Sequence, residues 1–202
     1  MMFEDIKGKT GLITGAGKRT GIGYGIARRL AEAGANVVLS DLTGPPQEQG
    51  FIQYGNLDGM QSIAAELADE FGVQTLFQEM DVTRAESVQA CMEGILKTFG
   101  SLHFVFNNAG TVFGAAQPIH EYDEGAWIKT FDVNIHGAFR VLKAAVPLMK
   151  ESGGAIVNMA SKAGKSPAPG NGAYGASKAA LIMMTKVMAH ELAPEGIRVN
   201  AI

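Results

Sequence analysis

The sequence predicts an α/β fold with a single doubly wound parallel sheet and helices on both of its faces. Three observations predict this fold. Short apolar runs alternate with longer segments of helical period along the whole chain. A glycine-rich turn follows the first apolar run, and 26 of the 202 residues are glycine, about twice the average share. The composition, 47% hydrophobic and 18% charged, allows one globular domain to bury a sizeable core.

The predicted strands and helices follow one another in pairs. Apolar runs indicate strands, and apolar residues that recur every three or four positions indicate helices. The first pairs are a strand at 11–14 with a helix at 22–33, a strand at 36–40 with a helix at 60–71, and a strand at 75–79 with a helix at 85–99. A strand at 102–106, a long helical stretch at 127–150, a strand at 155–159, a helix at 173–192 and a strand at 197–202 complete the series. Right-handed crossovers between parallel strands place these helices on both faces of the sheet.

Charge and cysteine content narrow the possible functions. The formal net charge is −3, from 17 Lys and Arg against 20 Asp and Glu, so no basic field attracts nucleic acid or anionic lipid. The single cysteine, Cys91, forms no internal disulfide, and the scattered histidines give no metal-binding motif. The sequence shows no targeting segment and no apolar stretch of membrane-spanning length. We therefore expect a cytoplasmic protein that binds no metal, nucleic acid or membrane.

A glycine-rich loop between the first strand and the first helix predicts a phosphate-binding site. It reads Thr14-Gly-Ala-Gly-Lys-Arg-Thr-Gly-Ile-Gly23. Glycines let the backbone approach a pyrophosphate closely, and the N–H groups and dipole of the helix N-terminus stabilise its negative charge. A purely structural turn is the alternative. The residues expected to bind a dinucleotide cofactor here are Gly15, Lys18, Arg19, Thr20, Gly21, Ile22 and Gly23.

An acidic residue at the end of the second strand predicts which dinucleotide binds. Asp41 stands where dinucleotide-binding folds place a carboxylate that accepts both ribose hydroxyls of NAD and repels the 2′-phosphate of NADP. Lys18 and Arg19 argue partly the other way, because cations in the loop attract that phosphate unless they face solvent. We therefore favour NAD(H) as the cofactor, with NADP(H) as the alternative.

Two segments depart from the regular alternation. Residues 42–59 are rich in Gly, Pro and Gln and delay the second helix. We expect a surface excursion there, or else a segment that packs on the adenosine side of the cofactor or on a neighbouring subunit. The chain also stops within its last expected strand without a turn signal, so we expect one domain over residues 1–202 that is incomplete at its C-terminus.

A tyrosine, a lysine and a serine form the predicted catalytic set. Tyr174 and Lys178 are four residues apart at the start of an expected helix, so their side chains share one face. Ser161 follows the fifth strand, where open α/β sheets bind ligands; alone it would indicate only a loop cap. A phenol with a pKa of about 10 is a poor base at neutral pH, but a neighbouring ammonium and a positively charged nicotinamide favour its ionised form. Tyr174 then serves as general acid–base while Ser161 holds the carbonyl or alkoxide oxygen.

Together these motifs resemble the short-chain dehydrogenase/reductase family over essentially the whole chain. The motifs are Thr14–Gly23, Asp81-Val82, Asn107-Asn108-Ala109-Gly110, Asn134, Ser161, Tyr174 with Lys178, and Arg198-Val199-Asn200-Ala201. The resemblance implies that Asp81 and Val82 flank the adenine, and that the 107–110 turn stabilises the central strands and borders the cofactor through Asn108, Ala109 and Gly110. It also implies that Lys178 binds the nicotinamide ribose and that Asn134, which alone would indicate an ordinary helix residue, holds a water of a proton relay. Residues 1–202 are then a single NAD(P)-binding Rossmann-fold domain that carries both the cofactor site and the catalytic site.

Two departures from the family pattern bear on function. Five residues separate Gly15 from Gly21, where most members have three, and this enlarged loop is similar to that of enoyl-thioester reductases. Those enzymes usually separate their tyrosine and lysine more widely, which favours alcohol or carbonyl chemistry here. Members also continue past Ile202 through a Pro-Gly turn, a mobile substrate lid and a last strand, so we expect the lid and the C-terminal strand to be missing.

We therefore expect an oxidoreductase that interconverts a secondary alcohol and a ketone by hydride transfer. Within enzymes the alternative is a 3-oxoacyl-thioester (acyl carrier protein) reductase that uses NADPH. From another class, the alternative is a non-catalytic nucleotide-binding redox sensor. The expected partners are a small-molecule alcohol or ketone and further copies of the chain, as a homodimer or homotetramer. Thr111–Gly114 and Ser166–Asn171 are candidate walls of the substrate pocket.

Overall fold

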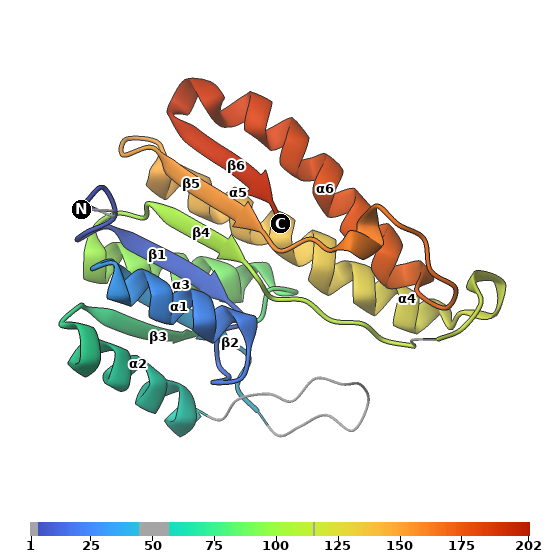
Figure 1. Ribbon diagram of the computed structural model, residues 1–202, viewed down its shortest axis with the longest axis horizontal. Coiled ribbons are helices and arrows are strands. Elements are labelled where there is room, and N and C mark those ends of the chain that lie inside the picture. The colour runs from blue at the N-terminus through green and yellow to red at the C-terminus, as the bar shows by residue number, and fades with distance from the viewer. Residues whose placement is uncertain (1–3, 45–56, 115) are drawn as a thin grey trace.

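The computed structural model describes residues 4–44, 57–114 and 116–202 (Figure 1). Within these residues six strands form one sheet in the order β3-β2-β1-β4-β5-β6, and every neighbouring pair is parallel. The strands are β1 (Thr10–Thr14), β2 (Asn36–Asp41), β3 (Thr75–Glu79), β4 (Phe104–Asn107), β5 (Gly154–Asn158) and β6 (Ile197–Ala201). The predicted doubly wound parallel sheet is confirmed.

Helices cover both faces of this sheet. α1 (Ile22–Glu32) and α2 (Leu57–Phe71) pack on one face through one apolar cluster, and α3 (Ala85–Phe99), α5 (Ala138–Met149) and α6 (Gly172–Leu192) pack on the other through a second cluster. α4 (Glu124–Phe131) precedes α5. Short 3₁₀ turns lie at η1 (Ile119–Glu121), η3 (Lys162–Gly164) and η4 (Ala193–Glu195). The predicted helices are present with ends within a few residues of the expected ones, except that the stretch predicted at 127–150 is divided into α4 and α5.

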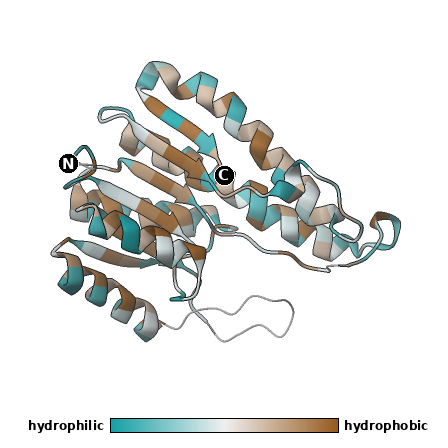
Figure 2. Ribbon diagram, viewed as in Figure 1, coloured by the Kyte–Doolittle hydropathy of each residue, from teal (hydrophilic) through white to brown (hydrophobic). Residues whose placement is uncertain are grey.

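The two apolar clusters follow from the alternation of side chains along each strand. Leu12 of β1 belongs to the cluster under α3 and α5, whereas its neighbour Ile13 belongs to the cluster under α1 and α2. A central parallel strand needs a continuous buried run for this reason, and all five residues of β1 are buried. Figure 2 shows the result as brown that is concentrated on the central strands.

The second helix starts earlier than expected. α2 begins at Leu57 rather than at residue 60, and Asp58 in its first turn is favoured by the positive end of the helix dipole. Of the excursion expected at 42–59, residues 45–56 lie outside the described residues. The structure therefore places only the two ends of that segment.

The long helix expected at 127–150 is interrupted in the middle. It begins earlier, at Glu124, because the Asp123 side chain accepts a hydrogen bond from Ala126 N at 2.7 Å and caps the helix. A π-helical segment, η2 (Asp132–Gly137), then separates α4 from α5. A Cβ on Gly137 would lie 2.7 Å from Val82 Cγ2, so glycine permits the close approach. Asn134, expected in ordinary helix, lies in this π segment.

Candidate active site

A cavity of about 760 Å³ lies at the carboxyl ends of the strands. The chain leaves β1 toward β2 on one side and returns to β4 on the other, and ligands bind where the strand order reverses in this way. Its walls come from segments that follow β1, β2, β3, β4 and β5 and from α4 to α6. Most predicted site residues line it, namely Gly15, Lys18, Gly21, Ile22, Asp41, Asp81, Val82, Asn108, Ala109, Gly110, Tyr174 and Lys178.

Five predicted site residues do not line this cavity in the described part of the chain: Arg19, Thr20, Gly23, Asn134 and Ser161. Gly23 and Asn134 are buried behind its wall, whereas Arg19 and Thr20 are exposed. Of the candidate substrate walls, Thr111, Val112 and Phe113 line the cavity and residues 166–171 do not. The cavity surface thus combines loop backbone and a few polar side chains with apolar side chains such as Met80, Val112 and Phe113.

Two glycines of the phosphate loop are required by close backbone contacts. Gly15 has a φ of +67°, and a Cβ there would lie 3.0 Å from Ala109 Cα. A Cβ on Gly23 would lie 2.5 Å from Gly15 O and 2.8 Å from Asn108 Nδ2. The first turn of α1 can therefore lie directly against the loop, with its N–H groups near the cavity.

Thr14 and Asn108 hold the loop against the turn that follows β4. The Thr14 hydroxyl oxygen accepts hydrogen bonds from Asn108 N at 3.0 Å and Ala109 N at 2.8 Å. In return, Asn108 Nδ2 donates to the carbonyl oxygens of Thr14 and Gly15, both at 2.9 Å. Sequence reasoning quoted Thr14 in the loop motif but gave it no role. Its position at the strand end, before the first glycine, was the available signal.

Asp41 is fixed by backbone hydrogen bonds at the end of β2. Gly17 N donates to Oδ2 at 2.7 Å, and Leu42 N donates to Oδ1 at 2.8 Å. Burial raises the pKa of the Asp41 carboxyl above its ordinary value. These two hydrogen bonds and the nearby Lys18 charge offset only part of that rise. Each carboxylate oxygen keeps a lone pair that is free to accept a further donor.

The two cations of the loop are placed differently. Lys18 lines the cavity, as expected for a residue that meets a ligand. Arg19 instead turns to α2, where its guanidinium pairs with the Glu66 carboxylate and contacts the Ser62 hydroxyl. Of the two cations that argued for a phosphate, only Lys18 therefore faces the site directly.

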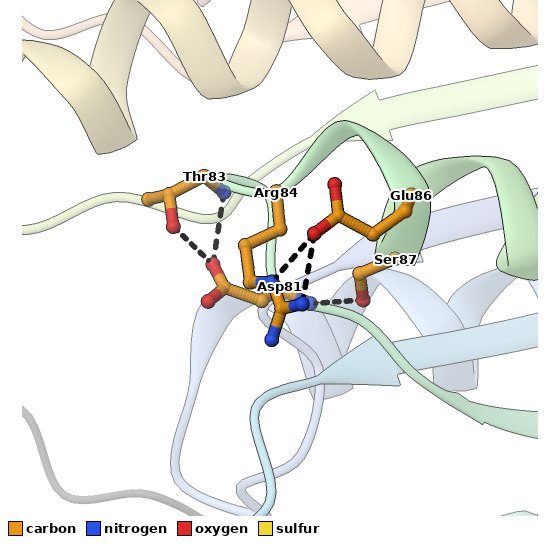
Figure 3. A network of polar contacts seen from close by, with 5 residues as sticks. All are labelled: Asp81, Thr83, Arg84, Glu86 and Ser87. Atoms are coloured by element: carbon orange, nitrogen blue, oxygen red, sulfur yellow. Dashed lines mark hydrogen bonds and ion pairs between the residues drawn. The ribbon is translucent and has the colours of Figure 1, made fainter.

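Asp81 lies in a polar network after β3 (Figure 3). Its Oδ1 accepts from Thr83 N at 2.9 Å and Thr83 Oγ1 at 2.7 Å, and its own N–H donates to Ser87 Oγ at 2.9 Å. Arg84 and Glu86 form an exposed ion pair beside it. These contacts fix the backbone of Asp81 and Val82 at the cavity wall and leave Asp81 Oδ2 without a hydrogen bond in the described part of the chain.

Tyr174 and Lys178 lie one turn apart on α6 and both face the cavity. The Lys178 ammonium lies 5.5 Å from the centroid of the Tyr174 ring and donates to Met159 O at 2.6 Å. Only 4% of Lys178 is exposed, and this burial lowers its pKa from 10.5 to about 8. A buried ammonium beside a phenol is suited to stabilising negative charge on the phenol oxygen.

Asn134 is buried and forms hydrogen bonds in two directions. Its Oδ1 accepts from Thr111 N at 2.8 Å, and its Nδ2 donates to Thr111 O at 2.9 Å and to Ser177 Oγ at 3.0 Å. Ser177 Oγ in turn donates to Tyr174 O at 2.8 Å. A Cβ on Gly110 would lie 3.3 Å from Asn134 Oδ1 and 3.4 Å from Lys178 Nζ, so these groups surround one small space. Sequence reasoning missed Ser177, although its spacing from Tyr174 places it within one helical turn.

Ser161 caps the short η3 turn. Its Oγ accepts a hydrogen bond from Ala163 N at 3.1 Å, and no hydrogen bond joins it to Tyr174 among the described residues. η3 packs tightly on α6, since a Cβ on Gly164 would lie 2.7 Å from the Lys178 carbonyl carbon. Ser161 therefore belongs to the same end of the sheet as Tyr174 and Lys178, with its hydroxyl engaged as a cap.

A buried chain of side chains ties α6 to the sheet. Asn107 Nδ2 donates to Asn158 Oδ1 at 2.9 Å, and Asn158 Nδ2 donates to Thr185 Oγ1 at 2.9 Å. Thr185 Oγ1 then donates to Leu181 O at 2.8 Å. This chain connects the ends of β4 and β5 to the helix that carries Tyr174 and Lys178.

Two further findings concern the whole described chain. Over residues 4–44, 57–114 and 116–202, no three His, Cys, Asp or Glu side chains gather in a way that could hold a metal ion. Over the same residues, no helix combines the length and the apolar composition that crossing a membrane requires.

Known proteins resemble this chain over nearly its whole length. The family model described as short chain dehydrogenase matches residues 9–202. Cyclohexanol dehydrogenase from Acinetobacter sp. (strain SE19) is 34% identical over 203 residues, covering 100% of this chain and 74% of that protein. The crystal structure of NAD⁺-bound xylitol dehydrogenase has a TM-score of 0.85 and 37% identity, covering 98% of this chain and 70% of that one. The crystal structure of L-sorbose reductase from Gluconobacter frateurii, complexed with NADPH and L-sorbose, has a TM-score of 0.85 and 33% identity. The match covers 97% of this chain and 68% of that one.

Proposed function

Because this chain belongs to the short-chain dehydrogenase family, we propose that it is an oxidoreductase that interconverts a secondary alcohol and a ketone with a nicotinamide cofactor. The observation that carries the proposal is the pair of Tyr174 and Lys178, which line the cavity from one face of α6. The names of the relatives support the reaction class. Two are dehydrogenases named for cyclohexanol and xylitol, and the third is a reductase named for L-sorbose.

The adenosine half of the cavity fits NAD(H). Gly15 and Gly23 leave the loop backbone open to a pyrophosphate at the N-terminus of α1. Asp41 retains acceptor capacity for two ribose hydroxyls, whereas an added 2′-phosphate would meet its negative charge. Asp81 and Val82 would flank the adenine. NAD(H) is therefore the proposed cofactor in preference to NADP(H), although Lys18 lines the same cavity.

When bound, the nicotinamide ring accepts or supplies the hydride, and the chain must move the matching proton. Tyr174 is the proposed acid–base: its phenolate accepts the hydroxyl proton during oxidation, and its phenol donates that proton during reduction. The Lys178 ammonium, held by Met159 O, stabilises the phenolate by its charge. Lys178 would also donate a hydrogen bond to the nicotinamide ribose.

Ser161 and Asn134 complete the proposed catalytic set. The Ser161 hydroxyl would donate a hydrogen bond to the substrate oxygen beside Tyr174, while its Oγ continues to accept the capping bond from Ala163 N. Asn134 would hold a water that connects the active site to solvent for the proton. The Asn134 side chain already forms hydrogen bonds with Thr111 and Ser177. Its backbone and the second lone pair of its Oδ1, which lies near Gly110, would therefore bind that water.

An assembly of copies of this chain is also proposed. Large apolar side chains are exposed on α5 and α6, among them Phe139 at 53%, Met183 at 58% and Val187 at 47%. Burying these apolar side chains of α5 and α6 against another subunit would remove them from water and so favour association. A homodimer or homotetramer through α5 and α6 is the proposed arrangement.

The experiment that tests the function measures reduction of NAD⁺ and NADP⁺ with a panel of secondary alcohols, for the wild type and for Tyr174→Phe. We expect NAD⁺-dependent turnover in the wild type that falls by about 10²–10⁴-fold in the variant, the usual contribution of a general acid–base. NADH binding, followed by fluorescence titration, should be retained by the variant, because the lost group is a hydroxyl outside the adenosine half.

Other outcomes would assign the chain differently. Tight NADH binding without turnover of any alcohol or ketone would contradict the proposed reaction and favour the redox sensor. Turnover of 3-oxoacyl thioesters with NADPH, in preference to simple ketones with NADH, would favour the acyl-thioester reductase.

A further inference from the structure

Both terminal nitrogens of the Arg19 guanidinium bond to α2, although Arg19 stands in the phosphate loop. Nη1 bonds to Glu66 Oε2, and Nη2 donates to Glu66 Oε1 at 2.6 Å and to Ser62 Oγ at 3.4 Å. This is the two-pronged geometry in which arginine binds a carboxylate best. The Ser62 hydroxyl also donates to Glu66 Oε1 at 3.2 Å and keeps the carboxylate turned toward the loop.

The pair is charged and directly accessible. Hydrogen bonding to Arg19 lowers the pKa of Glu66, and the same bond raises the pKa of Arg19, so both are ionised at neutral pH. The two side chains are 46% and 53% exposed. A phosphate that approached Arg19 from solvent would therefore compete with a full negative charge that is already in place.

The loop that carries Arg19 also contacts the strand end where the adenosine ribose is proposed to bind. A Cβ on Gly17 would lie 2.9 Å from Asp41 Cβ and would overlap Met60 Sδ of α2. Gly17 is two residues before Arg19, and Met60 is on the same helix as Glu66. Asp41 and the Arg19–Glu66 pair are therefore joined through the same short stretch of loop and helix.

We propose that Glu66 is a specificity-determining residue that disfavours NADP(H), because it holds Arg19 against α2 and so withholds this cation from a 2′-phosphate. The inference rests on the proposed function, in which the loop and Asp41 bind the adenosine half of the cofactor. Asp41 repels the phosphate directly, and Glu66 removes an available counter-charge. The carboxylates of Asp41 on β2 and Glu66 on α2 then both favour NAD(H) over NADP(H).

The chain carries a matched control for this inference. Arg28 of α1 pairs with Glu70 of α2, one helical turn after Glu66, and these side chains are 43% and 49% exposed. Neither Arg28 nor Glu70 lines the cavity among the described residues. Removing Glu70 therefore changes the net charge and removes a half-exposed ion pair of α2 as removing Glu66 does, but frees no cation of the loop.

The test measures the dissociation constants of NADH and NADPH by calorimetry, at low ionic strength, for four proteins: wild type, Glu66→Ala, Glu70→Ala and the double variant Arg19→Gln/Glu66→Ala. Alanine preserves the helix. We expect Glu66→Ala to tighten NADPH binding about three- to tenfold, the range for one freed charge-assisted contact, and to leave NADH within about twofold. The double variant should lose the gain, and Glu70→Ala should not show it.

Three outcomes would overturn the inference. Equal tightening of NADPH by Glu66→Ala and Glu70→Ala would indicate a general effect of net charge. Weaker binding of both cofactors by Glu66→Ala would indicate that Glu66 only maintains the shape of the loop. Unchanged NADPH binding in Glu66→Ala would show that Arg19 does not reach the phosphate. A wild type that binds neither NADH nor NADPH would contradict the proposed function itself.

Discussion

The two halves of the cavity are built in different ways. Around β1, β2 and β3 the site is built largely on glycine-rich backbone, and the charged pair beside it, Arg19 with Glu66, is about half exposed. Around β4, β5 and α6 the site consists of buried polar side chains that bond to one another. Asn134, Asn158 and Lys178 are only 1%, 0% and 4% exposed.

This difference separates the residues that serve both function and folding from those that serve function alone. A buried polar group that loses its partner is costly, whereas an exposed ion pair contributes little to stability. Substitutions in the catalytic half should therefore change the free energy of unfolding as well as activity. Substitutions in the adenosine half should change cofactor binding and leave stability nearly unaltered.

The largest expected effect on stability concerns Lys178 and pH. Its pKa is lowered from 10.5 to about 8 in the folded protein, so the folded state binds fewer protons than the unfolded state between these values. The free energy of unfolding should therefore gain up to about 3 kcal/mol from this residue as pH rises from 7 to 10.5. Lys178→Met should lack that gain, which urea unfolding of both proteins at the two pH values would measure.

The comparison between wild type and variant cancels the titration of groups that do not interact with Lys178, and adding Tyr174→Phe to both proteins removes the phenol beside it. If the two stability curves ran parallel from pH 7 to 10.5, the Lys178 ammonium would not be destabilised by burial. The catalytic half would then not differ from the adenosine half by the energetic cost of a buried charge.

A second test compares two asparagines with two hydrogen bonds each. Asn158→Ala should leave Asn107 Nδ2 without a partner in the core and remove the donor to Thr185 Oγ1, at a cost of about 1–3 kcal/mol of unfolding free energy. Asn36→Ala removes two exposed bonds, to Gly8 O and from Gln74 N, and should cost less than about 1 kcal/mol. Chemical denaturation of both variants gives the difference, and equal losses would refute the contrast.

The smallest expected effect is in the adenosine half and concerns binding alone. Asp41→Asn removes a negative charge from the proposed ribose site and keeps an oxygen that can accept a hydrogen bond. The ratio of NADPH to NADH affinity should rise about tenfold, with little change in the melting temperature. Asp69→Asn, an exposed change of the same charge on α2, is the control. A large fall in melting temperature for Asp41→Asn would show that this half is also structural.

Local patterns predicted much of the fold and the more local part of the site. Each of these signals lies within a single strand–turn–helix unit of its own. They are the glycines at 15 and 23, Asp41 at a strand end, and the spacing of Tyr174 and Lys178. Gly15, Asp41, Tyr174 and Lys178 line one cavity, and Gly23 is buried behind its wall. Their catalytic and binding roles stay predictions.

The remainder depends on partners that are distant in sequence. Arg19 meets Glu66 across 47 positions, and Asn134 meets Ser177 across 43. No local pattern encodes such pairs, because they arise only when helices pack on the finished sheet. The π segment is a similar case: its Gly137 lies against Val82, which is distant in sequence, and periodicity alone predicted an uninterrupted helix.

The contact between Gly137 and Val82 has an evolutionary consequence. The residue that borders the proposed adenine site touches the helical segment that carries Asn134, with no space for a single added methyl group. A larger residue at position 137 must therefore be accompanied by a smaller one at position 82, or by a shift of the two segments apart. Drift in one part of the active site is thereby constrained by the other, and the two positions should change together during divergence.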